Sequence, residues 1–293
     1  MNKTFSLYLM NEKGYTVLEH IIQNVGSDHI EFVISSEDKN VIKDYYSEIK
    51  CICQENNIPI YNRLDAPKSN SEFSFAIGWR WIINTDSKLI VFHDSLLPKY
   101  RGFSPLVNAL VNGEDIVGVT ALYATEEYDE GDIIGQQSMK VRYPIKIQDA
   151  IKDMSTLYSN LALDIVERIV SEQEVKAVKQ DNAQATYSLW RDEQDYEIDW
   201  NQSAHDIKRF IDATGFPFKG AKTTMDGMQV RVFESEVIQD VVVENRTPGK
   251  VIFMKEGFPV IVCKEGLLKI VSMRDELNNS ELIPMKKFRV RFK

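Results

Sequence analysis

The first half of the chain alternates short apolar runs with segments whose apolar residues recur at helical spacing. The runs that predict strands span residues 5–10, 31–35, 58–61, 73–77 and 89–92, and helical spacing starts at Gly14 and recurs over residues 41–55. This alternation is typical of an α/β fold in which helices doubly wind a parallel sheet, a Rossmann-like arrangement. Ligands of such sheets bind beyond the carboxyl ends of the strands. We therefore expect a functional site at that edge.

The pattern changes after residue 180. Before it, helical spacing at 105–110 and 147–171 and strand-like runs at 117–124 and 133–141 complete the α/β part. After a polar stretch, Ser203 is placed to cap a short helix. Four β-like runs then follow at residues 229–236, 250–253, 259–263 and 267–273. Short strands at this spacing predict a small, OB-like β-barrel. We expect domains at residues 1–190 and 200–293.

The charge balance disfavours a nucleic-acid partner. The net charge is −9, whereas binding to polyanions depends on clustered basic side chains. One dense basic group occurs, and we interpret it as a solvated tail: Lys286, Lys287, Arg289, Arg291 and Lys293. No apolar segment is long enough to span a membrane or to serve as a signal. We expect a soluble cytoplasmic protein. A homodimer is compatible with the sequence.

The three cysteines show no pattern of a metal site. Cys51 and Cys53 form a lone C-x-C, and Cys263 is far along the chain. No histidine or cysteine cluster stands near them at metal-ligand spacing. We expect three unpaired thiols, which fit the cytoplasm, and no bound metal.

A histidine stands where a predicted strand ends. His93 follows the run at 89–92 and precedes a loop with Pro98 and Gly102. Imidazole suits proton transfer near neutral pH. A second polar turn, Tyr128-Asp129-Glu130-Gly131-Asp132, lies between two predicted strands, so Asp129 is placed to orient His93 or to relay protons. Taken alone, a single histidine is more often structural than catalytic.

The sequence that begins at His93 is a more specific indicator of function than the histidine alone. HDSLLPKYRGFSPLVNALVNGEDIVGVTALYATEEYDEGDII resembles the signature of the formyltransferases that use N10-formyltetrahydrofolate. These include the methionyl-tRNA, glycinamide ribonucleotide, aminoarabinose and sugar-nucleotide enzymes. The matching positions are His93, Ser95, Leu96, Leu97, Pro98, Tyr100, Arg101, Gly102, Pro105, Gly113, Gly118, Val119, Thr120, Asp129 and Gly131. The resemblance continues through Trp190-Arg191, Ile198-Asp199-Trp200 and Phe216–Ala221.

The resemblance implies roles for individual residues. His93 would be the general acid and base beside the formyl carbon, and Asp129 would assist removal of the amine proton. The residues that would contact the acceptor are Ser95, Tyr100, Arg101, Gly102, Thr120 and Arg191. Those that would line the folate pocket are Gly78, Trp79, Arg80, Leu97 and Pro98. The alternative for Arg101 is a structural ion pair with Asp129 or Glu130. The alternative for Trp79 and its aromatic neighbour Trp81 is a packed aromatic cluster with no ligand.

One position departs from the family pattern. The family usually carries Asn two residues before the histidine, and this chain has Val91, which cannot donate a hydrogen bond. A backbone N–H, Asn84 or the imidazolium of His93 would have to stabilise the oxyanion instead. Asp94 adjoins His93, but neighbouring strand residues alternate between faces, so we expect it to point away from the site.

Elimination among the acceptors favours a sugar nucleotide. The stretch SSEDKNVIKDYYSEIKCICQENN lacks the basic insertion of the tRNA enzymes, and MNEKGY replaces the glycine-rich loop of the glycinamide enzyme. We expect an amino sugar of the cell-surface polysaccharide (lipopolysaccharide and O-antigen) pathways as the acceptor. The alternatives are a methionyl-tRNA enzyme, a formyltetrahydrofolate hydrolase, and a folate-binding protein without activity.

Overall fold

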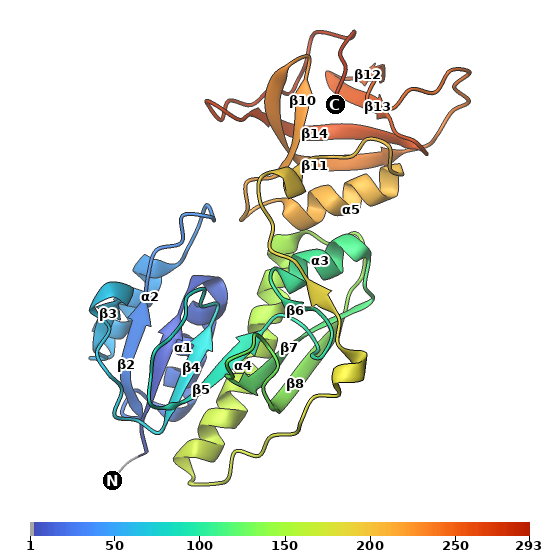
Figure 1. Cartoon of the computed structure of the whole chain (residues 1–293). Coiled ribbons are helices and arrows are strands. Elements are labelled where there is room, and N and C mark those ends of the chain that lie inside the picture. Colours follow the sequence, from blue (N-terminus) through green and yellow to red (C-terminus); the bar gives the residue numbers. More distant parts are fainter. Residues whose placement is uncertain (1–2) are drawn as a thin grey trace. The chain divides into compact units, whose positions relative to one another are not determined.

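The chain forms two compact units in the computed structural model, which describes residues 3–293 (Figure 1). The first unit comprises the residues up to Leu106, Asp115–Val141 and Asp149–Trp190. The second comprises Val107–Glu114, Arg142–Gln148 and Arg191–Lys293. Each unit has its own sheet, and the predicted class, α/β with a separate β unit, is confirmed.

A seven-stranded sheet forms the first unit, in the order β3-β2-β1-β4-β5-β7-β8. Its strands are β1 (Phe5–Leu9), β2 (Ile30–Ser35), β3 (Ile60–Asn62), β4 (Phe73–Ile77), β5 (Lys88–His93), β7 (Ile116–Tyr123) and β8 (Ile133–Lys140). The first five are parallel, whereas β7 runs antiparallel to β5 and to β8. The sheet is therefore mixed rather than wholly parallel. The connection from Ala124 to Asp132 is too short for a crossover, so β8 returns as a hairpin.

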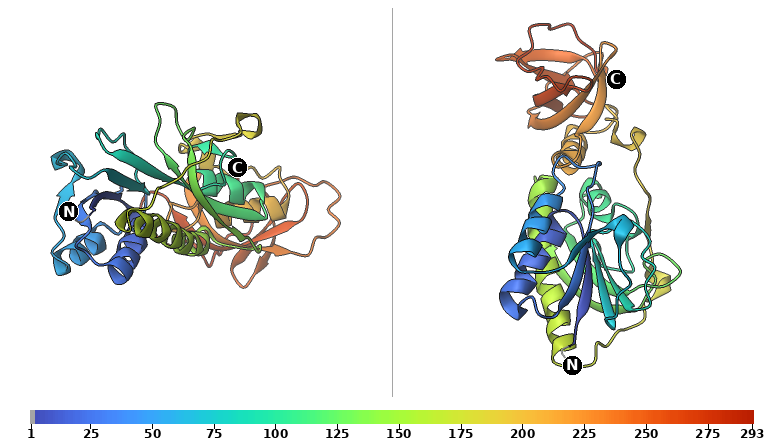
Figure 2. Two further views of the ribbon diagram at one scale, coloured as in Figure 1. Left: turned by 90° about the horizontal axis from the view of Figure 1, so that it is seen from below. Right: turned by 90° about the vertical axis from the view of Figure 1, so that its left-hand side faces the viewer.

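Helices cover one face of this sheet (Figure 2). Helix α1 (Asn11–Val25) and helix α4 (Ile147–Val170) lie side by side against it, and α2 (Tyr46–Glu55) packs beside α1. The Phe92 ring of β5 packs on Tyr158 of α4, with centroids 5.6 Å apart. Because side chains alternate along a strand, His93 points to the opposite face. Loops cover that face.

Several element ends differ from the sequence prediction. Helix α2 begins at Tyr46 rather than near Val41, because Tyr45 has a left-handed backbone with φ 58°. Helix α1 begins at Asn11, three residues before the glycine that marked the pattern. The two-residue strands β6 (Arg101–Gly102) and β9 (Tyr187–Ser188), which pair in parallel, were not predicted. The remaining short elements are α3 (Pro105–Asn112) and the 3-10 helices η1 (Arg63–Asp65), η2 (Asn182–Gln184) and η3 (Gln194–Tyr196).

The second unit contains a five-stranded antiparallel sheet in the order β10-β11-β14-β13-β12. Its elements are α5 (Ala204–Thr214), β10 (Ala221–Met225), β11 (Met228–Ile238), β12 (Val251–Lys255), β13 (Phe258–Val262) and β14 (Leu267–Asp275). Ser203 caps α5 as predicted, since its hydroxyl accepts a hydrogen bond from the Asp206 N–H at 3.1 Å. Strand β10 was missed, because AKTTM lacks an alternation of apolar side chains.

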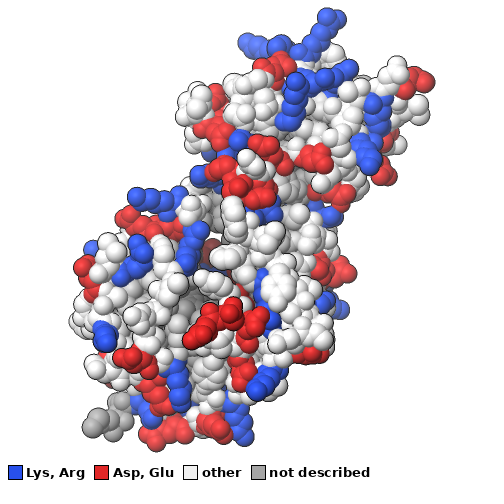
Figure 3. Space-filling model, in the orientation of Figure 1, with Lys and Arg blue, Asp and Glu red and all other residues white. Residues whose placement is uncertain are grey.

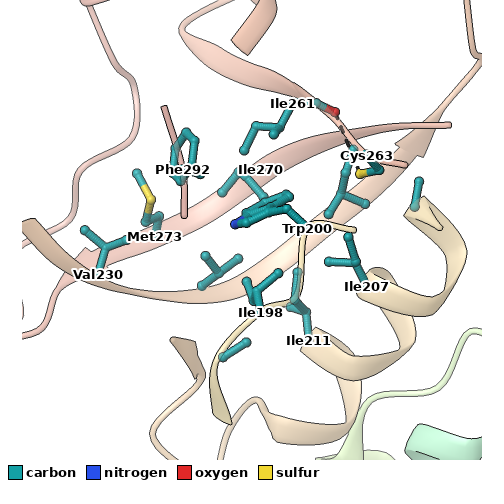
Figure 4. Packing of buried hydrophobic residues seen from close by; sticks show 14 of the residues in the cluster. Ile198, Trp200, Ile207, Ile211, Val230, Ile261, Cys263, Ile270, Met273 and Phe292 are labelled. Atoms are coloured by element: carbon teal, nitrogen blue, oxygen red, sulfur yellow. Dashed lines mark hydrogen bonds between the residues drawn. The ribbon is translucent and has the colours of Figure 1, made fainter. Parts of the chain in front are cut away.

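Trp200 lies at the centre of the second unit's core (Figure 4). Its ring is 5.6 Å from that of Phe292, and its indole N–H donates to the Thr223 hydroxyl at 3.0 Å. Isoleucines from α5 and the sheet pack around it, among them Ile207 and Ile270. Large aromatic side chains of this kind bury about 150–250 Å² each and contribute strongly to the stability of a core.

The last residues close this sheet. Phe292 N–H donates to Gly249 O at 2.7 Å, and Lys293 exchanges two hydrogen bonds with Thr224 of β10. Val290 O accepts from Val251 of β12 at 3.3 Å, so the segment bridges the two edge strands. The interpretation of these residues as a solvated tail was wrong: the basic side chains are exposed, but Val290 and Phe292 are buried between them. The OB-like character of this barrel stays a prediction.

The thiols are unpaired, as predicted. Burial raises the pKa of Cys53 and that of Cys263 to about 12, so neither is a reactive thiolate. Over residues 3–293, no helix has both the length and the apolar character needed to cross a bilayer. The same residues contain no group of three or more His, Cys, Asp or Glu side chains placed to hold a metal ion.

Candidate active site

His93 and Asp129 meet at the carboxyl edge of the sheet. Strand β5 ends at His93, which is 7% exposed. Its Nδ1 lies 3.3 Å from Asp129 Oδ1, and its Nε2 lies 2.7 Å from the carbonyl oxygen of Tyr100. A carbonyl and a carboxylate only accept hydrogen bonds, so the ring bonds to both only when both nitrogens carry protons.

The turn between β7 and β8 is built to present Asp129. The residue has a left-handed backbone with φ 58°, and its Oδ2 accepts the Gly102 N–H at 2.8 Å. The Gln180 side-chain amide donates to the carbonyl oxygens of Asp129 and Gly131 at 2.7 and 2.8 Å. A Cβ on Gly131 would lie 1.7 Å from Tyr123 O, so only glycine fits there. Sequence reasoning missed Gln180, because no local pattern marks it.

The loop after His93 is held by its own polar groups. Thr120 Oγ1 donates to Ser95 O at 2.7 Å and accepts the Leu97 N–H at 3.1 Å, while Ser95 Oγ donates to Lys99 O at 2.6 Å. Thr120, Ser95 and Leu97 are all buried, and Pro98 follows a cis peptide bond. The structure therefore gives Ser95 and Thr120 a scaffolding role at the site.

Arg101 is the clearest difference from the predicted binding roles. It is 1% exposed, and its guanidinium donates to Glu130, Gln180 and Asn182 at distances of 2.6 to 3.1 Å. A side chain buried and paired in this way is not presented to an acceptor. The alternative, a structural pair with Glu130, is what the structure shows. Arg101 thereby ties the Asp129 turn to the segment after α4.

Replacing Arg101 with methionine is expected to lower the free energy of unfolding by about 3–5 kcal/mol, the usual cost of breaking a buried ion pair by removing one partner. Denaturant unfolding followed by tryptophan fluorescence measures the change. Arg168→Met on the surface of α4, where the arginine pairs with Asp164, serves as the control. An unchanged stability together with weaker ligand binding would restore the binding role for Arg101.

The predicted folate region follows β4, the strand next to β5. Gly78 has φ 64°, and a Cβ there would lie 2.6 Å from Met10 O, so the chain turns tightly at this point. The indole ring of Trp79 packs against Tyr8 and Trp81, and its buried N–H has no hydrogen-bond partner among residues 3–293. Arg80 donates to Asp38 at 2.6 Å and is still 45% exposed. A buried donor without a partner is what a ligand or water would satisfy.

Arg191, which the resemblance placed among the acceptor contacts, belongs to the second unit, where it donates to Asn108 Oδ1 at 2.8 Å and lies over the rings of Tyr196 and Phe210. Val91 lies two residues before His93 on the same face of β5 and pairs with Leu122 of β7. Asn84 is exposed in the loop between β4 and β5. The Val91 side chain offers no hydrogen-bond donor.

Two sequence profiles of known families match the chain. Residues 73–184, which contain His93 and Asp129, match the profile described as formyl transferase. Residues 191–287 match the profile of the formyl transferase C-terminal domain. The chain belongs to the formyl transferase family. The first match spans β4 to β8 of the first sheet, and the second match spans the five strands of the second sheet.

Relatives and solved structures point to different members of this family. The methionyl-tRNA formyltransferase of Fusobacterium nucleatum is 32% identical over 192 residues, which cover 64% of this chain and 60% of that protein. The sugar 3N-formyl transferase WlaRD, solved in the presence of dTDP and 5-N-formyl-THF, has a TM-score of 0.68 at 19% identity and covers 96% of this chain and all of the other. The Helicobacter canadensis N-formyltransferase, solved with folinic acid and dTDP-3-aminofucose, has a TM-score of 0.65 at 18% identity, over 92% and 98% of the chains. At these identities, the two structures establish the fold alone.

Proposed function

We propose that the chain transfers a formyl group from N10-formyltetrahydrofolate to the amine of a nucleotide-linked amino sugar. The observation that carries the proposal is the His93–Asp129 pair, 3.3 Å apart at the carboxyl edge of the sheet, within the part that matches the family. The proposal places the enzyme in the cytoplasm as part of cell-surface polysaccharide synthesis. Its folate pocket would include the residues after β4, with Leu97 and Pro98 of the loop after His93.

The reaction is an acyl transfer from one nitrogen to another. The amine attacks the formyl carbon, a tetrahedral oxyanion forms, and the bond from that carbon to N10 then breaks. The acceptor nitrogen loses one proton and N10 gains one. In this scheme Asp129 draws the proton from the amine, and His93 donates to the oxyanion and returns a proton to N10.

The imidazolium of His93 is the candidate for the donor that Val91 cannot supply. Its Nε2 is hydrogen-bonded to Tyr100 O in this structure. The formyl oxygen would therefore either share the Nε2 proton with that carbonyl or replace the carbonyl as acceptor. The Tyr100 backbone has φ 59°, which directs the loop over the imidazole. A preorganised donor of this kind typically contributes a factor of about 10²–10³ in rate.

Exposed aromatic residues flank the pair. Phe103, next to Gly102, is 50% exposed, and Tyr128, next to Asp129, is 66% exposed. Their ring centroids are 6.0 Å apart. Exposed rings beside a catalytic pair suit stacking against a planar base. They support an acceptor that carries a nucleotide.

The charge distribution supports a small acceptor over a tRNA. The net charge is −9, and on the face drawn in Figure 3 acidic and basic side chains are interspersed, apart from a group of basic side chains at the top of the second unit. Because affinity for RNA depends on released counterions, such a surface binds it poorly. The curated relatives favour the tRNA alternative. The match covers only 60% of the first of them, so methionyl-tRNA remains the second candidate.

The deciding experiment offers the chain N10-formyltetrahydrofolate with a panel of dTDP- and UDP-linked 3-amino and 4-amino sugars, and separately with methionyl-tRNA. Mass analysis detects the gain of one formyl group. The proposal expects formylation of one amino sugar and little of the tRNA. Formate release without any amine would identify a hydrolase, and folate binding without turnover would identify a binding protein; either result overturns the proposal.

A further inference from the structure

A charged network lies behind His93, on the helix-covered face of the sheet. Lys13 Nζ of α1 is 2.5 Å from Asp94 Oδ2, and the Tyr158 hydroxyl of α4 donates to Asp94 Oδ1 at 2.5 Å. Lys13 Nζ also lies 5.3 Å from the centre of the Tyr158 ring. The Lys13 and Asp94 side chains are 12% and 24% exposed, and Tyr158 is 1% exposed. Asp94 points away from the site, as predicted.

The network holds the residues on both sides of His93. Tyr158 packs its ring on Phe92 at 5.6 Å, and its hydroxyl also reaches Phe92 O at 3.4 Å. On the other side of His93, the Asp94 carboxylate is bound by Lys13 and Tyr158 together. With both neighbours fixed, the backbone of His93 has little freedom, and the direction of its imidazole is set from the opposite face.

We propose that Lys13, Asp94 and Tyr158 are positioning residues for His93, which fix its backbone and balance the charge behind its imidazole. This role rests on the proposed catalytic function of His93. A buried ion pair is weak evidence for stability but is well suited to fixing one arrangement. None of the three faces the formyl group, so they act through His93.

The charges around His93 come from both sides of the sheet. On the site face, Asp129 meets Nδ1 and the neutral carbonyl of Tyr100 meets Nε2. Behind the strand stand Asp94, Lys13 and Tyr158. Burial alone would raise the pKa of Asp94, but Lys13 and the Tyr158 hydroxyl outweigh it and hold that pKa below its ordinary value. The carboxylate is therefore charged, and its pair with Lys13 is neutral overall.

Two single substitutions disturb this balance in opposite directions. Asp94→Asn leaves the Lys13 cation and should lower the titration midpoint of His93; Lys13→Met leaves the carboxylate and should raise it. A shift of about 1 pH unit is expected for a unit charge roughly 10 Å away at an effective dielectric constant of about 20. The double variant should return the midpoint close to that of the native chain. Histidine NMR measures it, with His93→Gln assigning the signal among four histidines.

Formyl transfer supplies the second readout. Asp94→Asn should lower kcat about tenfold with little change in KM, and Asp94→Glu should recover part of the loss. Asp212→Asn is the matched control, because Asp212 forms a similarly buried pair with Lys208 in the second unit. An unchanged His93 midpoint in both single variants, shifts in the same direction, or an equal shift in the control would overturn the proposal. The NMR result stands even if the native chain transfers no formyl group, so failure of the proposed function is detected separately.

Discussion

Replacing His93 with glutamine is expected to lower the rate of formyl transfer by a factor of about 10²–10⁴, the usual contribution of a positioned acid–base group. Glutamine can still donate a hydrogen bond, but it cannot return a proton to N10. The loss should appear in kcat, with KM for the folate nearly unchanged, because the imidazole acts mainly in the transition state. Steady-state kinetics with the acceptor that the amine panel identifies measures both constants.

Asp129→Asn tests the other half of the pair. It keeps the shape of the side chain and an oxygen for the Gly102 N–H, but it removes the charge that meets Nδ1. Its loss should resemble that of His93→Gln, and the double variant should be little worse than either, since the two residues act as a unit. His205→Gln, at an exposed position of α5, is the control. Native rates in either site variant would refute the assignment.

Replacing Phe292 with alanine is expected to lower the free energy of unfolding of the second unit by about 3–5 kcal/mol, the range for truncating a buried aromatic side chain. Phe292 is 1% exposed and packs on Trp200, and its backbone lies between the two edge strands. Removing the ring leaves a cavity at the point where the sheet closes. Denaturant unfolding followed by tryptophan fluorescence measures the effect.

Phe288→Ala provides a control of identical chemistry. Phe288 is 46% exposed, so its truncation leaves no enclosed cavity and should cost less than about 1 kcal/mol. Equal losses in the two variants would show that the terminal segment is not part of the core. The two units can unfold separately, so the transition of each is fitted by itself.

The strands were largely predictable, because buried strands read as apolar runs bounded by polar turns. Strand β4 matches its predicted range, and β5 places His93 at its end. The pair with Asp129 was predictable only through the long motif around both residues. The C-terminal segment that closes the second sheet also carries a strand pattern, which its high positive charge made easy to overlook. From Arg289 to Lys293, exposed cations alternate with the buried Val290 and Phe292. That period of two is the pattern of a strand.

The roles of individual polar residues were not predictable from local sequence. The sequence predicted that Arg101 would contact the acceptor. Two of the residues that its guanidinium binds in the structure, Gln180 and Asn182, lie 79 and 81 residues further along the chain. Lys13 and Asp94 are likewise 81 residues apart. A sequence pattern indicates the face of the strand or helix on which a side chain lies. It does not indicate which distant residue forms the hydrogen bond or ion pair with that side chain.

The segment that follows α4 also determines which fragment of the chain can be catalytically competent. A fragment that stops at the end of α4 would retain all seven strands of the first sheet, and with them His93 and Asp129. It would lack Gln180, which holds the Asp129 turn, and Thr186, whose backbone bonds to Pro98 O and Arg101 N–H on the other loop. The shortest excised enzyme must therefore run past Ser188. A boundary drawn where helix α4 ends would yield a folded sheet in which the two loops that carry Asp129 and Tyr100 are less firmly held.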